Sequence, residues 1–155
     1  MRLRNGSGME NNLMVWHYDA DGNLKDYKEY HNLIVDDGLA LSSQLLGEGL
    51  GGDRISHIAV GTDSTPPSSG QSALLSEEMR DEASVSLEET NVAGDTARFA
   101  NTFNFASATN VRELGLFNAA SNGVMFARKD VVHDMEAGEN LQVQWDVVSS
   151  EKEEE

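Results

Sequence analysis

The chain contains no cysteine and only 2 prolines, and aromatic side chains occupy only 6% of its 155 positions. Without cysteine, neither a disulfide framework nor a thiolate metal site can form. Stability must therefore come from packing or from partner subunits. No run of about 18 apolar residues occurs, and residues 1–12 lack the apolar stretch of a signal peptide. The sequence therefore predicts neither a membrane span nor a secretion leader.

Basic residues are also scarce. Lys and Arg total 11 against 27 for Asp and Glu, which gives a formal net charge of -16 at pH 7. A nucleic-acid backbone and an anionic membrane surface both reward clustered Lys and Arg. The composition therefore argues against nucleic acid and against an anionic membrane surface as partners.

The acidity has two interpretations. The chain is either an ordinary acidic protein or a protein adapted to high salt, where dense carboxylates stay hydrated and their mutual repulsion is screened. Only four lysines occur, and acids stand at many expected surface positions. This bias favours the halophilic interpretation.

Short alternating segments separated by turn residues dominate what is present, a pattern typical of an all-β fold. We expect an antiparallel β-sandwich, jelly-roll-like, with about seven or eight strands, one short helix and an N-terminal β-hairpin. The last strand shows strict period two, with Leu141, Val143 and Trp145 alternating with polar residues. The expected strands cover residues 13–18, 24–35, 55–61, 82–90, 97–105, 111–118, 124–132 and 141–148.

These segments predict one domain over residues 12–149, in which the hairpin 12–35 is free to project as an arm. Residues 1–11 are expected to be a flexible or partner-docking arm, and residues 150–155 an acidic tail. Arg2 and Arg4 stand out in so acidic a chain, and we interpret them as part of an inter-subunit arm.

One helix of about ten residues is expected after His31, in GLALSSQLL. Asp36 and Asp37 are its N-cap candidates. An apolar stripe is expected from Leu39, Leu41, Leu45 and Leu46. Residues 73–80, in contrast, predict a short helical turn or an irregular connector.

No set of residues predicts catalysis. Residues 19–23, DADGN, resemble the start of a calcium loop, but Gly22 is at the fourth position and Tyr30 at the twelfth, so a hairpin turn is the better interpretation. The histidines lack metal-ligand spacing; His17 and His31 could approach each other across the hairpin, but two histidines make a poor site. No G-x-S-x-G elbow occurs. We therefore expect no enzyme activity, no metal and no cofactor.

Charges beside apolar residues predict structural ion pairs, because a charge kept in such surroundings usually needs a partner. Arg80 and Glu113 have this setting. They pair with each other, or each pairs locally, Arg80 with an acid and Glu113 with Arg128. Solvent-facing positions at the rim of the fold are the alternative.

Four aromatic residues are clustered in the predicted hairpin and offer a stacking surface for a receptor, a glycan or another partner. They are Trp16, Tyr18, Tyr27 and Tyr30.

The order of motifs over residues 31–148 resembles a family of small tail-fibre or baseplate-associated structural proteins of tailed phages. The segment VRELGLFNAASNGVMFARKDVV is the most distinctive part, and it is followed by ENLQVQWDVV. Matching segments run from Asn32 to Gly38, Ile58 to Thr62, Leu74 to Arg80 and Arg112 to Arg128.

This resemblance implies a virion structural protein, a tail or baseplate component or a fibre adaptor. It would assemble as a homotrimer or ring and contact other virion proteins, with a host cell-surface receptor as a further partner. A capsid decoration or turret protein is the first alternative, and a receptor- or glycan-binding module is the second. No collagen-like or coiled-coil shaft occurs in the sequence, which favours an adaptor or short spike over a long fibre.

Overall fold

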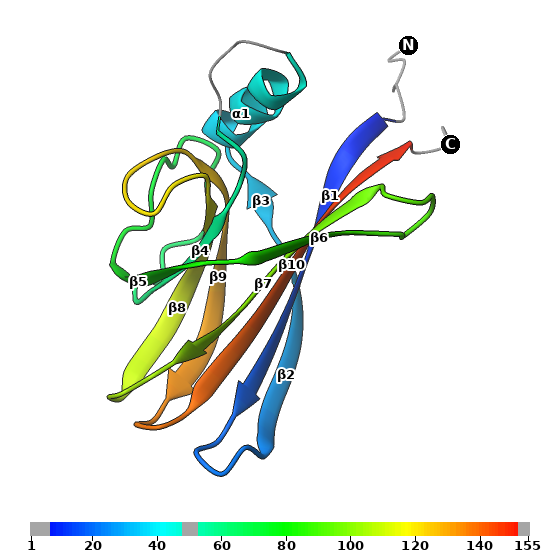
Figure 1. Ribbon diagram of the computed structural model, residues 1–155. Helices are drawn as coiled ribbons and strands as arrows, with labels where there is room; N and C mark the ends of the chain where they lie inside the picture. The colour runs from blue at the N-terminus through cyan, green and yellow to red at the C-terminus, as the bar shows by residue number, and fades with distance from the viewer. Residues whose placement is uncertain (1–6, 48–52, 152–155) are drawn as a thin grey trace.

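The computed structural model describes residues 7–47 and 53–151. Within them it contains ten β-strands and one short helix, arranged as two five-stranded sheets that enclose a shared core (Figure 1). The predicted all-β sandwich is confirmed, with more strands than expected. The elements are β1 (Ser7–Tyr18), β2 (Leu24–His31), β3 (Leu33–Ile34), α1 (Asp36–Leu46), β4 (His57–Gly61), β5 (Glu77–Glu82), β6 (Ser84–Glu88), β7 (Thr96–Asn104), β8 (Thr109–Phe117), β9 (Met125–Met135) and β10 (Asn140–Glu151).

The first sheet has the order β2-β1-β10-β7-β6, the second β3-β9-β8-β4-β5, and neighbouring strands are antiparallel. The first and last strands lie side by side, from the pair Ser7–Glu151 to the pair Tyr18–Asn140. The expected arm is therefore wrong for residues 7–11, and the expected acidic tail is wrong for residues 150–151. Strands β1 and β2 form the predicted hairpin, but β1 lies inside the sheet, so the hairpin does not project.

The strand expected over residues 24–35 is divided between the two sheets. Strand β2 ends at His31, and β3 pairs with β9 in the second sheet. Asn32 lies at the crossing, where its Oδ1 accepts a hydrogen bond from the Trp145 indole N–H at 3.1 Å. The side-chain amide therefore satisfies the one polar atom of a fully buried tryptophan at the point where the chain changes sheet.

The helical turn expected in residues 73–80 is wrong for its second half, because Glu77–Glu82 forms β5 at the edge of the second sheet. Five of its six residues are charged, so no hydrophobic alternation marks it as a strand. The strand expected over residues 82–90 is also shorter than predicted. It is interrupted at Ala83, where the chain passes from the second sheet to the first.

The core lies between the two sheets, and residues from β1, β4, β7, β8, β9 and β10 fill it. The fully buried side chains of largest volume there include Trp145, Phe103, Phe126, Leu13, Leu41, Ile58, Leu114, Leu116 and Met135. Trp145 comes from the strand whose period-two pattern was clearest in the sequence. A smaller second cluster lies on the other side of the second sheet and consists of Val35, Ala59, Leu74, Phe117 and Met125.

The predicted helix is present, but its N-cap is Val35, which makes no side-chain cap hydrogen bond. Asp36 and Asp37 lie in the first turn, where carboxylates favour the positive end of the helix dipole. Of the four leucines expected to form a stripe, only Leu41 is buried. Gly38 lies against the Phe126 main chain, which leaves no room for a Cβ atom. The helix therefore contacts β9 closely at its start, while the rest of it stays uncovered.

Candidate functional site

The outer face of the second sheet is covered by residues 62–76, the segment that connects β4 to β5. Small residues make room beneath it. A Cβ atom on Gly61 would overlap the Glu113 carboxylate and the Ser76 carbonyl, and one on Gly115 would overlap the Phe117 and Leu74 side chains. The covering segment therefore lies close against β4 at Gly61 and against β8 at Gly115.

Glu113 fixes residues 62–76 to the second sheet through hydrogen bonds. Its two carboxylate oxygens accept hydrogen bonds from the backbone N–H groups of Asp63 at 3.2 Å, Leu75 at 2.9 Å and Ser76 at 2.7 Å. The side chain is 0% exposed. Both oxygens of this buried carboxylate therefore receive hydrogen bonds from the covering segment.

Arg128 is the ionic partner of Glu113, with its Nε 3.0 Å from a carboxylate oxygen, and it is also 0% exposed. Its remaining N–H groups donate to the Thr65 carbonyl at 2.6 Å and to the Asp63 carbonyl at 3.3 Å. Together the two residues bond both ends of the covering segment to β8 and β9. The arrangement can fix a loop, and its carboxylate oxygens are occupied by donors from the protein itself.

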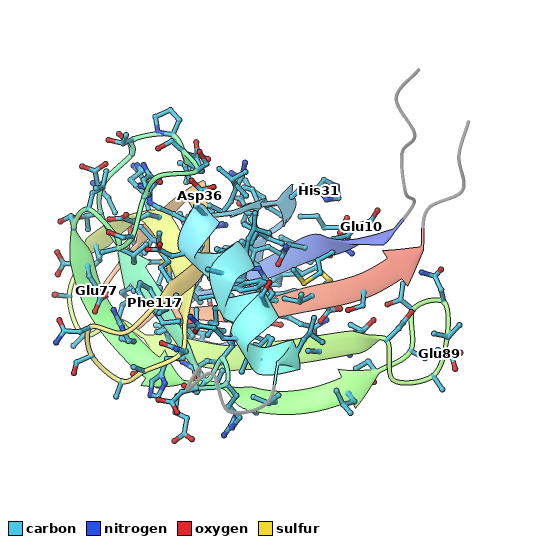
Figure 2. The ribbon with its side chains drawn as sticks, turned by 90° about the horizontal axis from the view of Figure 1, so that it is seen from above. Glu10, His31, Asp36, Glu77, Glu89 and Phe117 are labelled. Atoms are coloured by element: carbon cyan, nitrogen blue, oxygen red, sulfur yellow. The ribbon has the colours of Figure 1, made fainter. Side chains whose placement is uncertain are left out.

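Arg80 pairs elsewhere, so the direct Arg80–Glu113 pairing is wrong and the local pairing is what the structure contains. Arg80 Nη2 lies 2.6 Å from a Glu77 carboxylate oxygen, and Nη1 donates to the carbonyls of Ala119 and Asn122. Its guanidinium lies 3.6 Å from the Phe117 ring centroid. Arg80 thus fixes the β8–β9 turn against β5. Two of the residues that Arg80 contacts, Glu77 and Phe117, are labelled at the left of Figure 2.

The four aromatic residues do not form one surface. Trp16 and Tyr27 are cross-strand partners on the outer face of the first sheet, with ring centroids 5.1 Å apart. Tyr18 follows Trp16 by two positions and lies on the same face. Tyr30 pairs with the core residue Leu13 and its hydroxyl lies 3.1 Å from His133 Nε2. The predicted surface is therefore wrong for Tyr30, because three positions separate it from Tyr27 in a strand of period two.

A buried polar cluster at the lower end of the sandwich was not found from the sequence. His17 Nε2 and Lys25 Nζ each lie 2.8 Å from a Glu139 carboxylate oxygen, and the Glu136 N–H donates to the same group. The Lys25 ammonium and these N–H donors lower the pKa of Glu139 to about 2. His17 neighbours His133 and not His31, which pairs with Asn12.

This cluster predicts a loss of stability on acidification. Burial, with Lys28 nearby, lowers the pKa of His133 to about 4. Between pH 6.5, the ordinary pKa of histidine, and pH 4, His133 is protonated in the unfolded chain but neutral in the folded chain. The free energy of unfolding therefore falls as the pH drops from about 6.5 to 4. Glu139 extends the loss to lower pH. Folding lowers the pKa of its carboxyl from 4.5 to about 2, so the stability that the carboxylate contributes is lost as the pH drops through this range.

We expect the midpoint of thermal unfolding to decrease over this pH range, and H133Q to flatten the dependence between pH 6.5 and 4. The exposed His31 provides the matched control, H31Q. An unchanged pH profile in H133Q would show that His133 is not the group responsible.

An apolar groove of about 490 Å³ lies between α1 and the first sheet. It occupies the end of the sandwich where β1 begins and β10 ends (Figure 1). Its lining residues include Met9, Leu39, Leu45, Leu46, Phe99 and Val147. Leu46 is 90% exposed. Arg2 and Arg4, the arginines assigned to an inter-subunit arm, lie outside the described residues.

In the part of the chain that the structure describes, no helix is long and apolar enough to cross a membrane, and no three His, Asp or Glu side chains are grouped to hold a metal ion. Comparison with protein-family models, curated proteins and solved structures finds no match for this chain.

Proposed function

We propose that the chain is a structural subunit of a tailed virus particle, a tail or baseplate component or fibre adaptor that assembles with copies of itself. In this role it links the tail to fibres or to host-recognition parts. The order of motifs from residue 31 to 148 supports the proposal, and so does the function of those motifs in the fold. Glu113, Arg128 and Arg80 all fix loops onto one sheet, which gives a rigid building block.

The observation that carries the proposal is the apolar groove beside α1. The chain has a net charge of -16, yet three leucines of one helix, Leu39, Leu45 and Leu46, are exposed along this groove. Uncovered leucines gathered on one surface are typical of a protein interface. In an isolated chain these leucines are exposed to water, and a neighbouring subunit would cover them.

The proposal predicts self-association in molar salt, measured by sedimentation or light scattering over a range of protein concentrations. L39S is expected to weaken association at least tenfold. The matched control is L75S, because Leu75 and Leu39 are both 51% exposed but Leu75 lies away from the groove. A wild-type chain that stays monomeric at about 100 μM in molar salt contradicts self-assembly, because interfaces of standard size bind far more tightly than this.

A capsid decoration or turret protein has the same physical requirements, since it too is a rigid sandwich that needs neighbours. Copy number separates the two positions. A tail component occurs in a few copies per particle on the tail axis, and a decoration occurs in many copies over the shell.

A receptor- or glycan-binding module is a second candidate, and one observation favours it. The row across the outer face of the first sheet contains Tyr27, Trp16, Gln142 and Thr102. It carries no charge in a chain that is otherwise dense in acids. Aromatic rings beside amide and hydroxyl groups suit a neutral sugar, which presents an apolar face and polar edges.

If this candidate is right, W16A and Y27A each reduce attachment to host cells at least tenfold and leave assembly intact. V132A serves as the control, because Val132 is an exposed apolar residue on the other sheet. Loss of assembly in W16A and Y27A would instead make the aromatic pair structural.

A further inference from the structure

The sandwich has four edge strands, and they differ sharply in how they are protected. Strand β2 carries four charged residues in eight, and β5 carries five in six. Strand β3 is only two residues long. Strand β6 is SVSLE, with one charge, and no strand of the described residues pairs with its outer side. Charges and short length are the usual protection against edge-to-edge pairing, so β6 is the unprotected edge.

The apolar residues of β6 lie on the core-facing side of the first sheet, at a position that the second sheet does not cover. Val85 pairs with Phe99 and Leu87 pairs with Ala97, so both lie on the face of the sheet that holds Phe99 in the core. Val85 is 43% exposed and Leu87 is 73% exposed. In Figure 2, the ribbon that leads to the labelled Glu89 forms the outer border of the first sheet. An uncovered strand edge and an uncovered apolar stripe therefore coincide.

We propose that two copies of the chain pair through β6, antiparallel, about a two-fold axis at Ser86, and so join their first sheets into one continuous sheet. The partner is a second copy because the strand complements itself in this register. Ser86 faces its own symmetry mate, Val85 faces Leu87 of the other copy, and Ser84 faces Glu88 of the other copy. The inference rests on the self-assembly in the proposed function and adds a second contact surface, the edge of β6, to the groove beside α1.

Charge also favours this register. Shifting the axis to Val85 would place Glu82 opposite Glu88, and like charges directly opposite destabilise a strand pair. With the axis at Ser86, residues 82–90 place no carboxylate opposite another. Glu88 is already balanced within its own copy, since the Arg98 guanidinium lies 3.8 Å away and Ser86 donates a hydrogen bond to it.

A two-fold contact uses the same surface on both copies, so it joins copies in pairs. The inference therefore predicts a dimer, or an even-numbered assembly of dimers, in place of a trimer. Because each copy carries a net charge of -16, screening by salt reduces the repulsion between copies. The dimer is expected to become tighter as the salt concentration rises.

The chain has no cysteine, so single cysteine variants test the register directly. Directly opposed Cβ atoms lie about 4.5–5.5 Å apart in an antiparallel pair, close to the span of a disulfide. S86C is therefore expected to form a covalent dimer under mild oxidation. S84C is the control, because the two copies of residue 84 would be four positions apart, about 13 Å. The double variant S84C/E88C restores cross-linking.

A second pair of variants tests the apolar stripe. V85D is expected to weaken the dimer at least tenfold, and V132D, at 55% exposure on the other sheet, is expected to leave it unchanged. The inference is overturned if S86C cross-links no better than S84C, or if V85D dissociates no more than V132D while both stay folded. An oligomer that persists under those results leaves the proposed function standing, whereas a wild-type monomer in molar salt contradicts both.

Discussion

Replacing Arg128 with methionine is expected to lower the free energy of unfolding by about 3–5 kcal/mol, the cost of leaving a buried charge without its partner. Glu113 would remain beneath residues 62–76, bonded to backbone N–H groups but with no cation to balance it. Chemical denaturation in constant salt measures the loss. R112M is the matched control, because Arg112 pairs with the exposed Asp134 and such surface pairs contribute about 0–1 kcal/mol.

The double variant E113Q/R128M should be more stable than R128M alone, since it removes the stranded charge while the Gln carbonyl still accepts a backbone hydrogen bond. If R128M loses no more stability than R112M, the buried pair is not what fixes the covering segment.

Transfer from about 2 M to about 0.01 M NaCl is expected to unfold the protein or to lower its thermal midpoint sharply. The cause is the excess of 27 acidic over 11 basic residues. Their repulsion is screened beyond about 3 Å at 1 M salt but reaches about 30 Å at 0.01 M. Thermal unfolding monitored by circular dichroism across this salt series gives the measurement.

The triple variant E78Q/E82Q/E89Q removes three exposed carboxylates and should show a shallower salt dependence than the wild type. Full stability of the wild type at 0.01 M salt would contradict the halophilic interpretation and leave the acidity as an ordinary property of the surface.

The sequence predicted those parts of the fold where one face of a strand is buried and the other is wet. Strand β10 is the clearest case, because Leu141, Val143 and Trp145 all reach the core. Strand β5 was missed because its charged residues lie on an edge and leave no alternation. The change of sheet at Asn32 was missed because the hydrogen bond found there joins Asn32 to Trp145, 113 positions away.

The candidate site was also predicted in part. Apolar neighbours marked Arg80 and Glu113 as charges in need of partners, but nothing local selected Arg128 over Arg80 as the partner of Glu113. The strand register decides this, since Gly115, two positions from Glu113, lies opposite Arg128. The separation of Tyr30 from Tyr27 could have been found from strand parity alone. The contact of Tyr30 with His133 could not, because it joins the two sheets.

Purified virus particles test whether this chain is one of their structural subunits. Quantitative mass spectrometry of purified particles, with the chain located in an electron microscopy map, gives its copy number and position. We expect a fixed, small number of copies on the tail, with first sheets joined through β6. Absence of the chain from purified, infectious particles would contradict it.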